Sequence, residues 1–172
     1  MIQLDHLAYT WVVTHRVAAL DGLMWWLSAL GRGGMVWLCL AVALLVLRRL
    51  SVRYGLQLVS AMLLAWLMTD YIGKPIANRE RPFVRTPTVD VLGSRPADPS
   101  FPSGHSASAF AAALTLTRAA PGAAAAWWIL AVAIAYSRIY LGVHYPLDVV
   151  GGALVGLICA MAIHVTLRRR CT

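Results

Sequence analysis

Long apolar runs separated by short polar segments dominate the chain after residue 30. Five of these runs, each 15 to 20 residues long, contain at most one charged side chain. A transmembrane helix needs about 20 mostly apolar residues, and five such runs in so short a chain are not typical of a soluble helical core. The pattern predicts five transmembrane helices, near residues 33–50, 54–74, 103–119, 122–141 and 146–168.

The first 30 residues have a different pattern, in which charged residues and histidines interrupt the apolar positions. The apolar side chains recur at three- and four-residue steps, as in amphipathic helices that lie in a membrane interface. They are Leu4, Leu7, Trp11, Val17, Leu20, Met24 and Leu27. Trp25 and Trp26 suit the aromatic belt of that interface. We expect residues 1–30 to form interfacial helices, with a sixth, polar-interrupted span as the alternative, and residues 31–172 to form the membrane core.

The longest polar segment, residues 75–102, connects the second and third expected spans and contains six prolines. A connection this long is uncommon in a compact protein unless it has a function. The expected fold is therefore an all-α, polytopic membrane helical bundle. It has about five transmembrane helices, N-terminal interfacial amphipathic helices and one long functional loop.

The composition agrees with a membrane protein. Of the 172 residues, 60% are hydrophobic and 13% are charged, and the mean hydropathy is +0.69. These values exclude a disordered chain, which needs low hydrophobicity and high net charge. They also disfavour a soluble domain, because too few polar side chains remain to cover its surface.

Two smaller features have structural interpretations. The three cysteines, Cys39, Cys159 and Cys171, form no CxxC pair, so we expect small apolar side chains rather than a metal site. Gly152 and Gly156 form a GxxxG motif in the last expected span, which allows close approach of helices. We expect this motif to pack within the bundle, with a dimer seam as the alternative.

The net charge of +8 by itself suggests a nucleic-acid partner. The positions of the charges relative to the expected spans indicate otherwise. If residues 48–53 lie on the cytoplasmic face, that face also receives Arg118 and the tail arginines at 168–170, which makes seven arginines and no acid. The opposite face holds eight basic and seven acidic residues. No nucleic-acid binding is expected, because the bases lie on two membrane faces rather than on one soluble patch.

The orientation in the membrane depends on what the outer bases do. The two faces carry nearly equal numbers of bases, and the positive-inside rule counts bases. Most bases on the face opposite residues 48–53 have a chemical role, described next, so we place that face outside the cytoplasm. The expected location is the inner (plasma) membrane, with the site facing the periplasm or the cell exterior.

Three polar clusters lie at the ends of expected spans on this outer face, where ionisable residues are candidates for function. They are residues 74–82, 102–105 and 137–148. Lys74, Arg81 and Arg138 supply three cations that would repel one another in an empty site. A phosphate group, with several oxygens, would resolve this repulsion.

The remaining polar residues of the clusters suit phosphoryl transfer. Ser103 and Gly104 lie at the expected start of a helix, where free N–H groups and the helix dipole bind anions. His144 and Asp148 are four residues apart, so the carboxylate can reach one imidazole nitrogen and leave the other as a nucleophile. His105 can protonate a leaving oxygen. Together they predict a site that needs no metal.

The clusters resemble the type-2 phosphatidic acid phosphatase family, the membrane relatives of vanadium haloperoxidases. The family pattern K-x6-RP, PSGH and SR-x5-H-x3-D is matched in order and at the same spacings between Lys74 and Asp148. The resemblance implies that His144 attacks phosphorus and forms a phosphohistidine that Asp148 orients. It implies that His105 protonates the leaving group and later activates water. It also implies, with no metal or cofactor, phosphate binding by Lys74, Arg81, Ser103, Gly104 and Arg138.

The expected protein is thus a phosphatase for a lipid phosphate or diphosphate, with residues 74–105 as its catalytic loop. Family analogy and the expected outer face favour undecaprenyl diphosphate as the substrate. Phosphatidylglycerol phosphate, phosphatidic acid and lipid A phosphates are alternatives. A non-catalytic lipid-phosphate-binding membrane protein is the alternative of another class, which the complete histidine and aspartate set disfavours. Many bacterial members have a further N-terminal span, which we do not expect here, and the oligomeric state is open.

Several charged residues near the clusters have less specific interpretations. We expect Arg79, Arg85 and Arg95 to be solvated loop charges, with guidance of an anionic headgroup as the alternative. Asp70 lies one helical turn before Lys74. We expect it to pair with Lys74 or with a nearby arginine rather than to act in catalysis.

Overall fold

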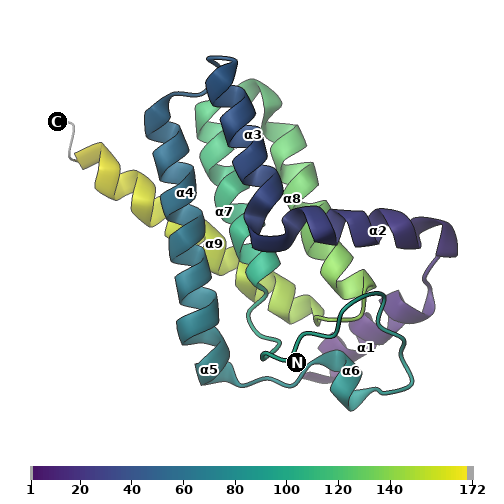
Figure 1. Ribbon diagram of the computed structural model, residues 1–172. Helices are drawn as coiled ribbons and strands as arrows, with labels where there is room; N and C mark the ends of the chain where they lie inside the picture. Colours follow the sequence, from purple (N-terminus) through teal and green to yellow (C-terminus); the bar gives the residue numbers. More distant parts are fainter. Residues whose placement is uncertain (1, 170–172) are drawn as a thin grey trace.

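The fold was analysed in a computed structural model that describes residues 2–169, and these residues form helices and connecting loops without a strand (Figure 1). Arg170 and Cys171, to which the sequence assigns a cytoplasmic charge and a small apolar side chain, lie outside the described residues. The helices are α1 (Ile2–Thr14), α2 (Ala18–Gly31), η1 (Arg32–Gly34), α3 (Met35–Val46), α4 (Val52–Leu67), η2 (Met68–Gly73), α5 (Lys74–Ala77), α6 (Pro82–Arg85), α7 (Gly104–Ala119), η3 (Pro121–Ala123), α8 (Ala124–Tyr140) and α9 (Pro146–Arg169).

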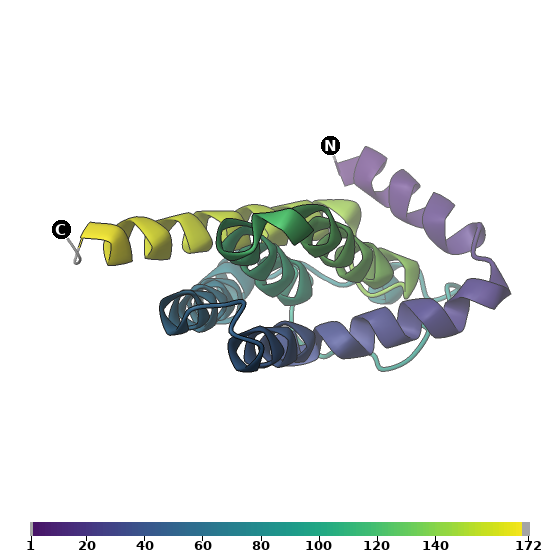
Figure 2. The ribbon, with the colours of Figure 1, turned by 90° about the horizontal axis from the view of Figure 1, so that it is seen from above.

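Helix α7 lies at the centre of the bundle and packs against α4, α8 and α9. Figure 2 shows α9 on one side of α7, and α3 and α4 on the other. Small side chains permit this close packing, because five alanines of α7 are fully buried. Gly152 and Gly156 of α9 face the backbone carbonyls of Ser103 and Ala107, leaving no room for a Cβ atom. The GxxxG motif therefore packs within the bundle, as expected.

Four helical segments of the described residues are long and apolar enough to cross a membrane: Ala18–Val46, Val52–Arg85, Pro121–Tyr140 and Pro146–Leu167. The chain is therefore a multi-span membrane protein. Helix α7, expected as a fifth span at 103–119, has only 16 residues, a length of about 24 Å. It is shorter than the hydrocarbon core of about 30 Å and packs between α4, α8 and α9.

A kink separates α2 from α3, and Figure 1 shows the two helices at a steep angle. The kink is built on Gly33 and Gly34, whose φ values of 59° and 71° lie in the left-handed region that glycine adopts without strain. Helix α3 by itself has 12 residues and is shorter than the span expected at 33–50. The apolar helical segment at this position instead begins in α2.

Helix α1 lies apart from the bundle at the edge of the molecule (Figure 2). Leu4, Leu7 and Trp11 are each more than 60% exposed, and they form the apolar face that the sequence pattern predicts. Tyr9 and Val13, on the opposite face, are buried against residues near the start of α9. One face of α1 thus packs on the protein, and an apolar face points outward.

The long polar segment contains more helix than the sequence suggests. The π-helical turn η2 continues α4 directly into α5, so this helix extends to Ala77. Turns of this kind occur often at functional sites, and here the turn carries Asp70 and leads into Lys74. After α6 the chain crosses the same end of the bundle (Figure 1) and reaches the start of α7. The three polar clusters therefore meet at one end of the bundle.

Candidate active site

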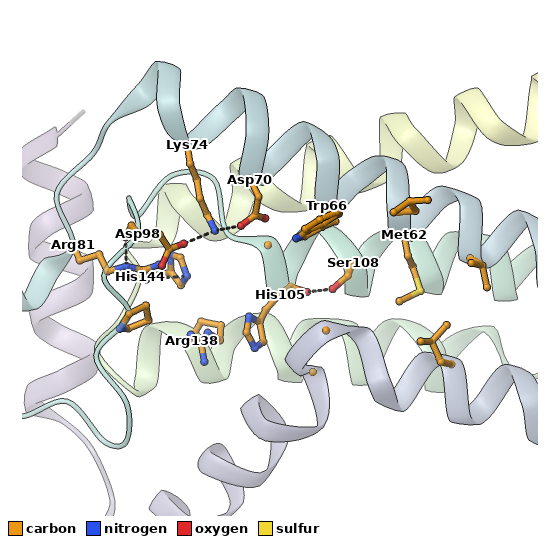
Figure 3. Close-up of a pocket in the computed structure, with 17 residues that line it drawn as sticks. Met62, Trp66, Asp70, Lys74, Arg81, Asp98, His105, Ser108, Arg138 and His144 are labelled. Atoms are coloured by element: carbon orange, nitrogen blue, oxygen red, sulfur yellow. Dashed lines mark hydrogen bonds and ion pairs between the residues drawn. The ribbon is translucent and has the colours of Figure 1, made fainter.

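The three sequence clusters line a single cavity of about 490 Å³. Lys74 comes from α5, Arg81 precedes α6, His105 is in the first turn of α7, Arg138 is near the end of α8, and His144 is in the turn before α9. Figure 3 shows these side chains around the polar end of the cavity. Segments that are up to 70 residues apart (144 − 74) thus form one site.

His144 is almost completely buried at the end of this cavity, with one ring nitrogen toward Arg81 and the other toward Asp148. Its Nε2 lies 3.3 Å from Arg81 Nη1. Because arginine can only donate, this contact requires an unprotonated Nε2, which places the ring proton on Nδ1. The Nδ1 atom is 3.5 Å from Asp148 Oδ2, longer than an ordinary hydrogen bond. The lone pair of Nε2 therefore points toward Arg81 at the polar end of the cavity, which both residues line.

The pKa of His144 is lowered from 6.5 to about 4, first by burial and then by the positive charges of Arg81 and Arg138, against the opposing effect of Asp148. The imidazole is therefore neutral at physiological pH. A neutral imidazole is the form that can attack phosphorus.

Asp148, in the first turn of α9, is fully buried and held by four groups. Its Oδ2 accepts hydrogen bonds from the Ser100 hydroxyl and from the backbone N–H of Tyr145, the latter at 2.8 Å. Its Oδ1 accepts one from Arg79 Nη1 at 2.6 Å. Its backbone carbonyl accepts one from the Ser103 N–H. The carboxylate next to His144 is thus fixed in orientation by groups from three other parts of the chain.

Two aspartates neutralise the cations that the sequence brings together. Lys74 Nζ lies 2.6 Å from Asp70 Oδ1 and 2.5 Å from Asp98 Oδ2, which confirms the expected pairing of Asp70. Arg81 Nη2 lies 3.0 Å from the other oxygen of Asp98. A carboxylate therefore bridges Lys74 and Arg81 at the position where the sequence predicts an anion with several oxygens (Figure 3).

Arg138 and His105 lie on the opposite side of the cavity from Lys74 (Figure 3). Arg138 donates to the hydroxyl of Ser28 in α2, and its Nε has no hydrogen-bond partner. The Nε2 atom of His105 is also buried without a partner. Both groups are therefore free to contact a ligand in the cavity that they line.

The two residues expected to bind phosphate at the start of α7 differ in their access to the cavity. Gly104 lines the cavity, so its backbone is accessible to a ligand. Ser103 is fully buried, and its hydroxyl accepts a hydrogen bond from Ser106 at 3.2 Å. Ser103 is not among the side chains that line the cavity. In this structure it joins α7 to the Asp148 backbone.

Arg79 has a different place from the one expected. The sequence suggests a solvated loop charge or a guide for a headgroup, and both interpretations are wrong. Arg79 is largely buried between Asp148 and Asp5 of α1. Local sequence gives no signal for this ion pair, because its partners are 69 and 74 residues away. Arg85, in contrast, is more than half exposed and pairs with Glu80, as a solvated charge does.

The other end of the cavity is apolar. From Lys74 and His144 the cavity continues along α4 to Trp66 and Met62 (Figure 3). Its apolar lining comes from α3 and α4, through Leu38, Val59, Met62, Leu63 and Trp66. A molecule that combines a phosphate group with an apolar chain matches these two ends.

Comparisons with known proteins agree with this geometry. Residues 54–171 match the PAP2 superfamily. An undecaprenyl-diphosphatase of Sulfolobus acidocaldarius is 37% identical over 83% of this chain and 68% of its own length. A putative undecaprenyl-diphosphatase of Escherichia coli is 37% identical over 64% of this chain and 54% of its own length. A lipid A 4'-phosphatase of Porphyromonas gingivalis is 31% identical over 81% and 62%, respectively. The chain therefore spans between about half and two thirds of these relatives.

Solved structures extend the likeness to the fold. The crystal structure of Aquifex aeolicus LpxE matches with a TM-score of 0.79 and 31% identity, over 91% of this chain and 92% of that one. A phosphatidylglycerolphosphate phosphatase of the transmembrane PAP2 type from Bacillus subtilis has the same fold, with a TM-score of 0.72 and 23% identity, over 97% and 86%. The chain therefore belongs to the PAP2 superfamily and is a multi-span membrane lipid phosphatase.

Proposed function

We propose that this protein removes the terminal phosphate of undecaprenyl diphosphate through a phosphohistidine at His144, without a metal, at the outer face of the inner (plasma) membrane. The cavity is the observation that carries the proposal. It joins His105 and the buried His144 to an apolar wall formed by α3 and α4. A ligand with a phosphate head and a long hydrocarbon chain would fill both parts, with its chain toward the lipid.

The chemistry follows from the groups around the polar end. His144 Nε2 attacks the terminal phosphorus, and the bond from that phosphorus to the bridging oxygen breaks. His105, whose Nε2 is buried without a partner, is placed to give a proton to the leaving oxygen. In the second step it takes a proton from the water that hydrolyses the phosphohistidine. Lys74, Arg81 and Arg138 stabilise the charge that develops on the phosphate oxygens.

The choice of undecaprenyl diphosphate as the substrate rests on the shape of the cavity and on the relatives. Two of the relatives described above are undecaprenyl-diphosphatases in name, and both are 37% identical to this chain. None of the cavity-lining residues from Leu38 to Trp66 carries a charge, which suits a prenyl chain. Phosphatidylglycerol phosphate, phosphatidic acid and lipid A phosphates share the same two-part chemistry, so a direct comparison must decide among them.

The test measures phosphate release by the purified protein in detergent with EDTA. Undecaprenyl diphosphate, phosphatidylglycerol phosphate, phosphatidic acid and a lipid A phosphate are compared at equal concentrations. We expect the highest kcat/KM for undecaprenyl diphosphate, and complete loss of activity in His144→Ala. His15→Ala, in the exposed turn that follows α1, is the matched control and is expected to keep full activity.

Each result bears on a separate part of the proposal. Acid-labile, alkali-stable radiolabel on the wild-type protein, and none on His144→Ala, would support the phosphohistidine. Activity that survives in His144→Ala would refute it, and dependence on added Mg²⁺ would refute metal-free catalysis. Release from none of the lipids would favour a non-catalytic lipid-phosphate-binding protein.

The orientation has its own test. Ser94 lies in the exposed loop beside the site, and Ser51 lies between α3 and α4 at the other end of the bundle. We expect Ser94→Cys to react with a membrane-impermeant thiol reagent applied to intact cells, and Ser51→Cys to react only after lysis. The reverse result would place the site in the cytoplasm.

A further inference from the structure

Helix α1 contacts the catalytic part of the protein through one buried carboxylate. Asp5 lies on the inner face of α1, one turn before Tyr9, and its side chain is only 1% exposed. Buried aspartates are rare unless they are paired. Asp5 is therefore expected to be paired, and its partners lie in segments that also carry the active site.

The two oxygens of Asp5 bind different elements. Oδ1 accepts a hydrogen bond at 2.8 Å from the backbone N–H of Leu147, in the first turn of α9. Oδ2 lies 2.5 Å from Arg79 Nη2. Asp5 thus holds both the start of the helix that carries Asp148 and the arginine that binds Asp148.

Arg79 completes the connection with the other arm of its guanidinium. Its Nη1 lies 2.6 Å from Asp148 Oδ1, and its guanidinium carbon lies 4.2 Å from the centre of the Tyr145 ring. The planar fork of arginine holds two carboxylates in a fixed geometry better than the single ammonium of lysine. Tyr145 in turn packs edge-on against Tyr9 of α1, with 5.4 Å between ring centres.

This chain of contacts holds one oxygen of Asp148. Arg79 binds Oδ1, while Ser100 and the Tyr145 N–H bind Oδ2, the oxygen that faces His144 Nδ1 at 3.5 Å. Loss of the Arg79 contact would let the carboxylate shift relative to the His144 ring. The position of the nucleophile therefore depends on a residue of α1 that does not line the cavity.

We propose that Asp5 is a positioning residue, which acts through Arg79 and Asp148 to hold His144 in the orientation for attack. The proposal rests on the function proposed above and adds α1 to the machinery of the enzyme. Asp5 contacts no reacting atom, so its loss changes the rate of the chemical step rather than the binding of the lipid. A displacement of about 1 Å in a reacting group can cost about 100-fold in rate. We expect Asp5→Asn to lower kcat by about 10- to 100-fold.

Asparagine is the appropriate replacement because it separates the two roles of Asp5. Its amide oxygen can still accept the hydrogen bond from Leu147, while its NH₂ group cannot bind the guanidinium of Arg79. Asp21→Asn is the matched control. Asp21 is an aspartate of α2 that accepts a hydrogen bond from the Tyr140 hydroxyl at 2.7 Å, and it has no contact with Asp148.

The assay measures kcat and KM for the best lipid substrate, together with the temperature of unfolding of each variant in the same detergent. A fall in kcat of Asp5→Asn with KM and unfolding temperature close to wild type, beside an unchanged Asp21→Asn, would support the proposal. Unchanged kcat, or a loss of activity that only follows a loss of folded protein, would overturn it.

Two further measurements keep the test decisive. If Asp5→Asn does not fold, Arg79→Lys takes its place, because it keeps the charge and loses the fork. A normal kcat in Arg79→Lys would overturn the proposal. In the double variant Asp5→Asn/Arg79→Lys we expect no further loss, because both changes break the same connection. If the wild type releases no phosphate from any lipid, the proposed function fails. Active wild type with an equally active Asp5→Asn refutes only the positioning role.

Discussion

Replacing Asp98 by asparagine is expected to tighten the binding of phosphate. Asp98 bridges Lys74 at 2.5 Å and Arg81 at 3.0 Å, so an incoming phosphate must compete with its carboxylate for both cations. Burial raises the pKa of Asp98, but the hydrogen bond from Lys74 and the charge of Arg81 outweigh this effect and place the pKa below its ordinary value. The carboxylate is therefore charged at neutral pH and competes there.

The size of the expected change in phosphate affinity follows from the solvent exposure of Asp98. The Asp98 side chain is 44% exposed, so each of its two ion pairs is screened by water and stabilises by no more than about 0.2–1 kcal/mol. Together they oppose phosphate binding by about 1 kcal/mol, which corresponds to an affinity change of about fivefold. Asparagine keeps the shape of the side chain and removes the charge.

The assay is the competitive inhibition constant of inorganic phosphate at constant ionic strength. We expect this constant to fall about fivefold in Asp98→Asn. Glu80→Gln is the matched control, since Glu80 belongs to the same segment between α5 and α7 but pairs with the exposed Arg85 at 3.0 Å. An inhibition constant that is unchanged or higher in Asp98→Asn would refute the reasoning. An equal fall of the constant in Glu80→Gln would also refute it, because any lost negative charge would then have the same effect.

Three further outcomes are expected. Because the pKa of His144 is lowered to about 4 and only the neutral ring attacks, the loss of kcat/KM caused by protonation of this nucleophile should be centred near pH 4; a loss centred near 6.5 would contradict the buried environment. Gly156→Leu should lower stability by about 1–3 kcal/mol, measured by thermal unfolding in detergent, because α9 lies directly on a carbonyl of α7, whereas Gly122→Ala, with open space around it, should not. Val59→Trp in the apolar lining of the cavity should raise KM for a long-chain lipid phosphate more than for a short-chain one, and Val132→Trp on the exposed side of α8 should affect neither.

The sequence by itself was sufficient for the fold class and for the three cations and two histidines that meet in the cavity. Apolar periodicity is a local property, so long runs predict helices that cross a membrane. The spacing of four residues between His144 and Asp148 also acts locally, because it brings the two side chains together at the start of α9. Charged residues at helix ends on one side of a membrane must share that surface, which brings Lys74, Arg81 and Arg138 into one site.

Only the tertiary structure decided which helix is central and where the chain turns. Helix α7 packs against α4, α8 and α9, and hydropathy along the chain does not report that packing. The kink at Gly33 and Gly34 depends on two left-handed residues. Glycine permits this conformation but does not require it, so the expected boundary near residue 33 marked a bend within a longer apolar segment.

The partners of the charged groups were likewise decided by the path of the loops. Asp98 bridges two cations, and Arg79 joins Asp148 to Asp5 across 69 and 74 residues of sequence. An ion pair of this kind forms where folding removes both groups from water, and desolvation is a property of the packed molecule rather than of a motif. The sequence therefore indicated which groups are candidates for the chemistry, and the tertiary structure determined which groups hold them in place.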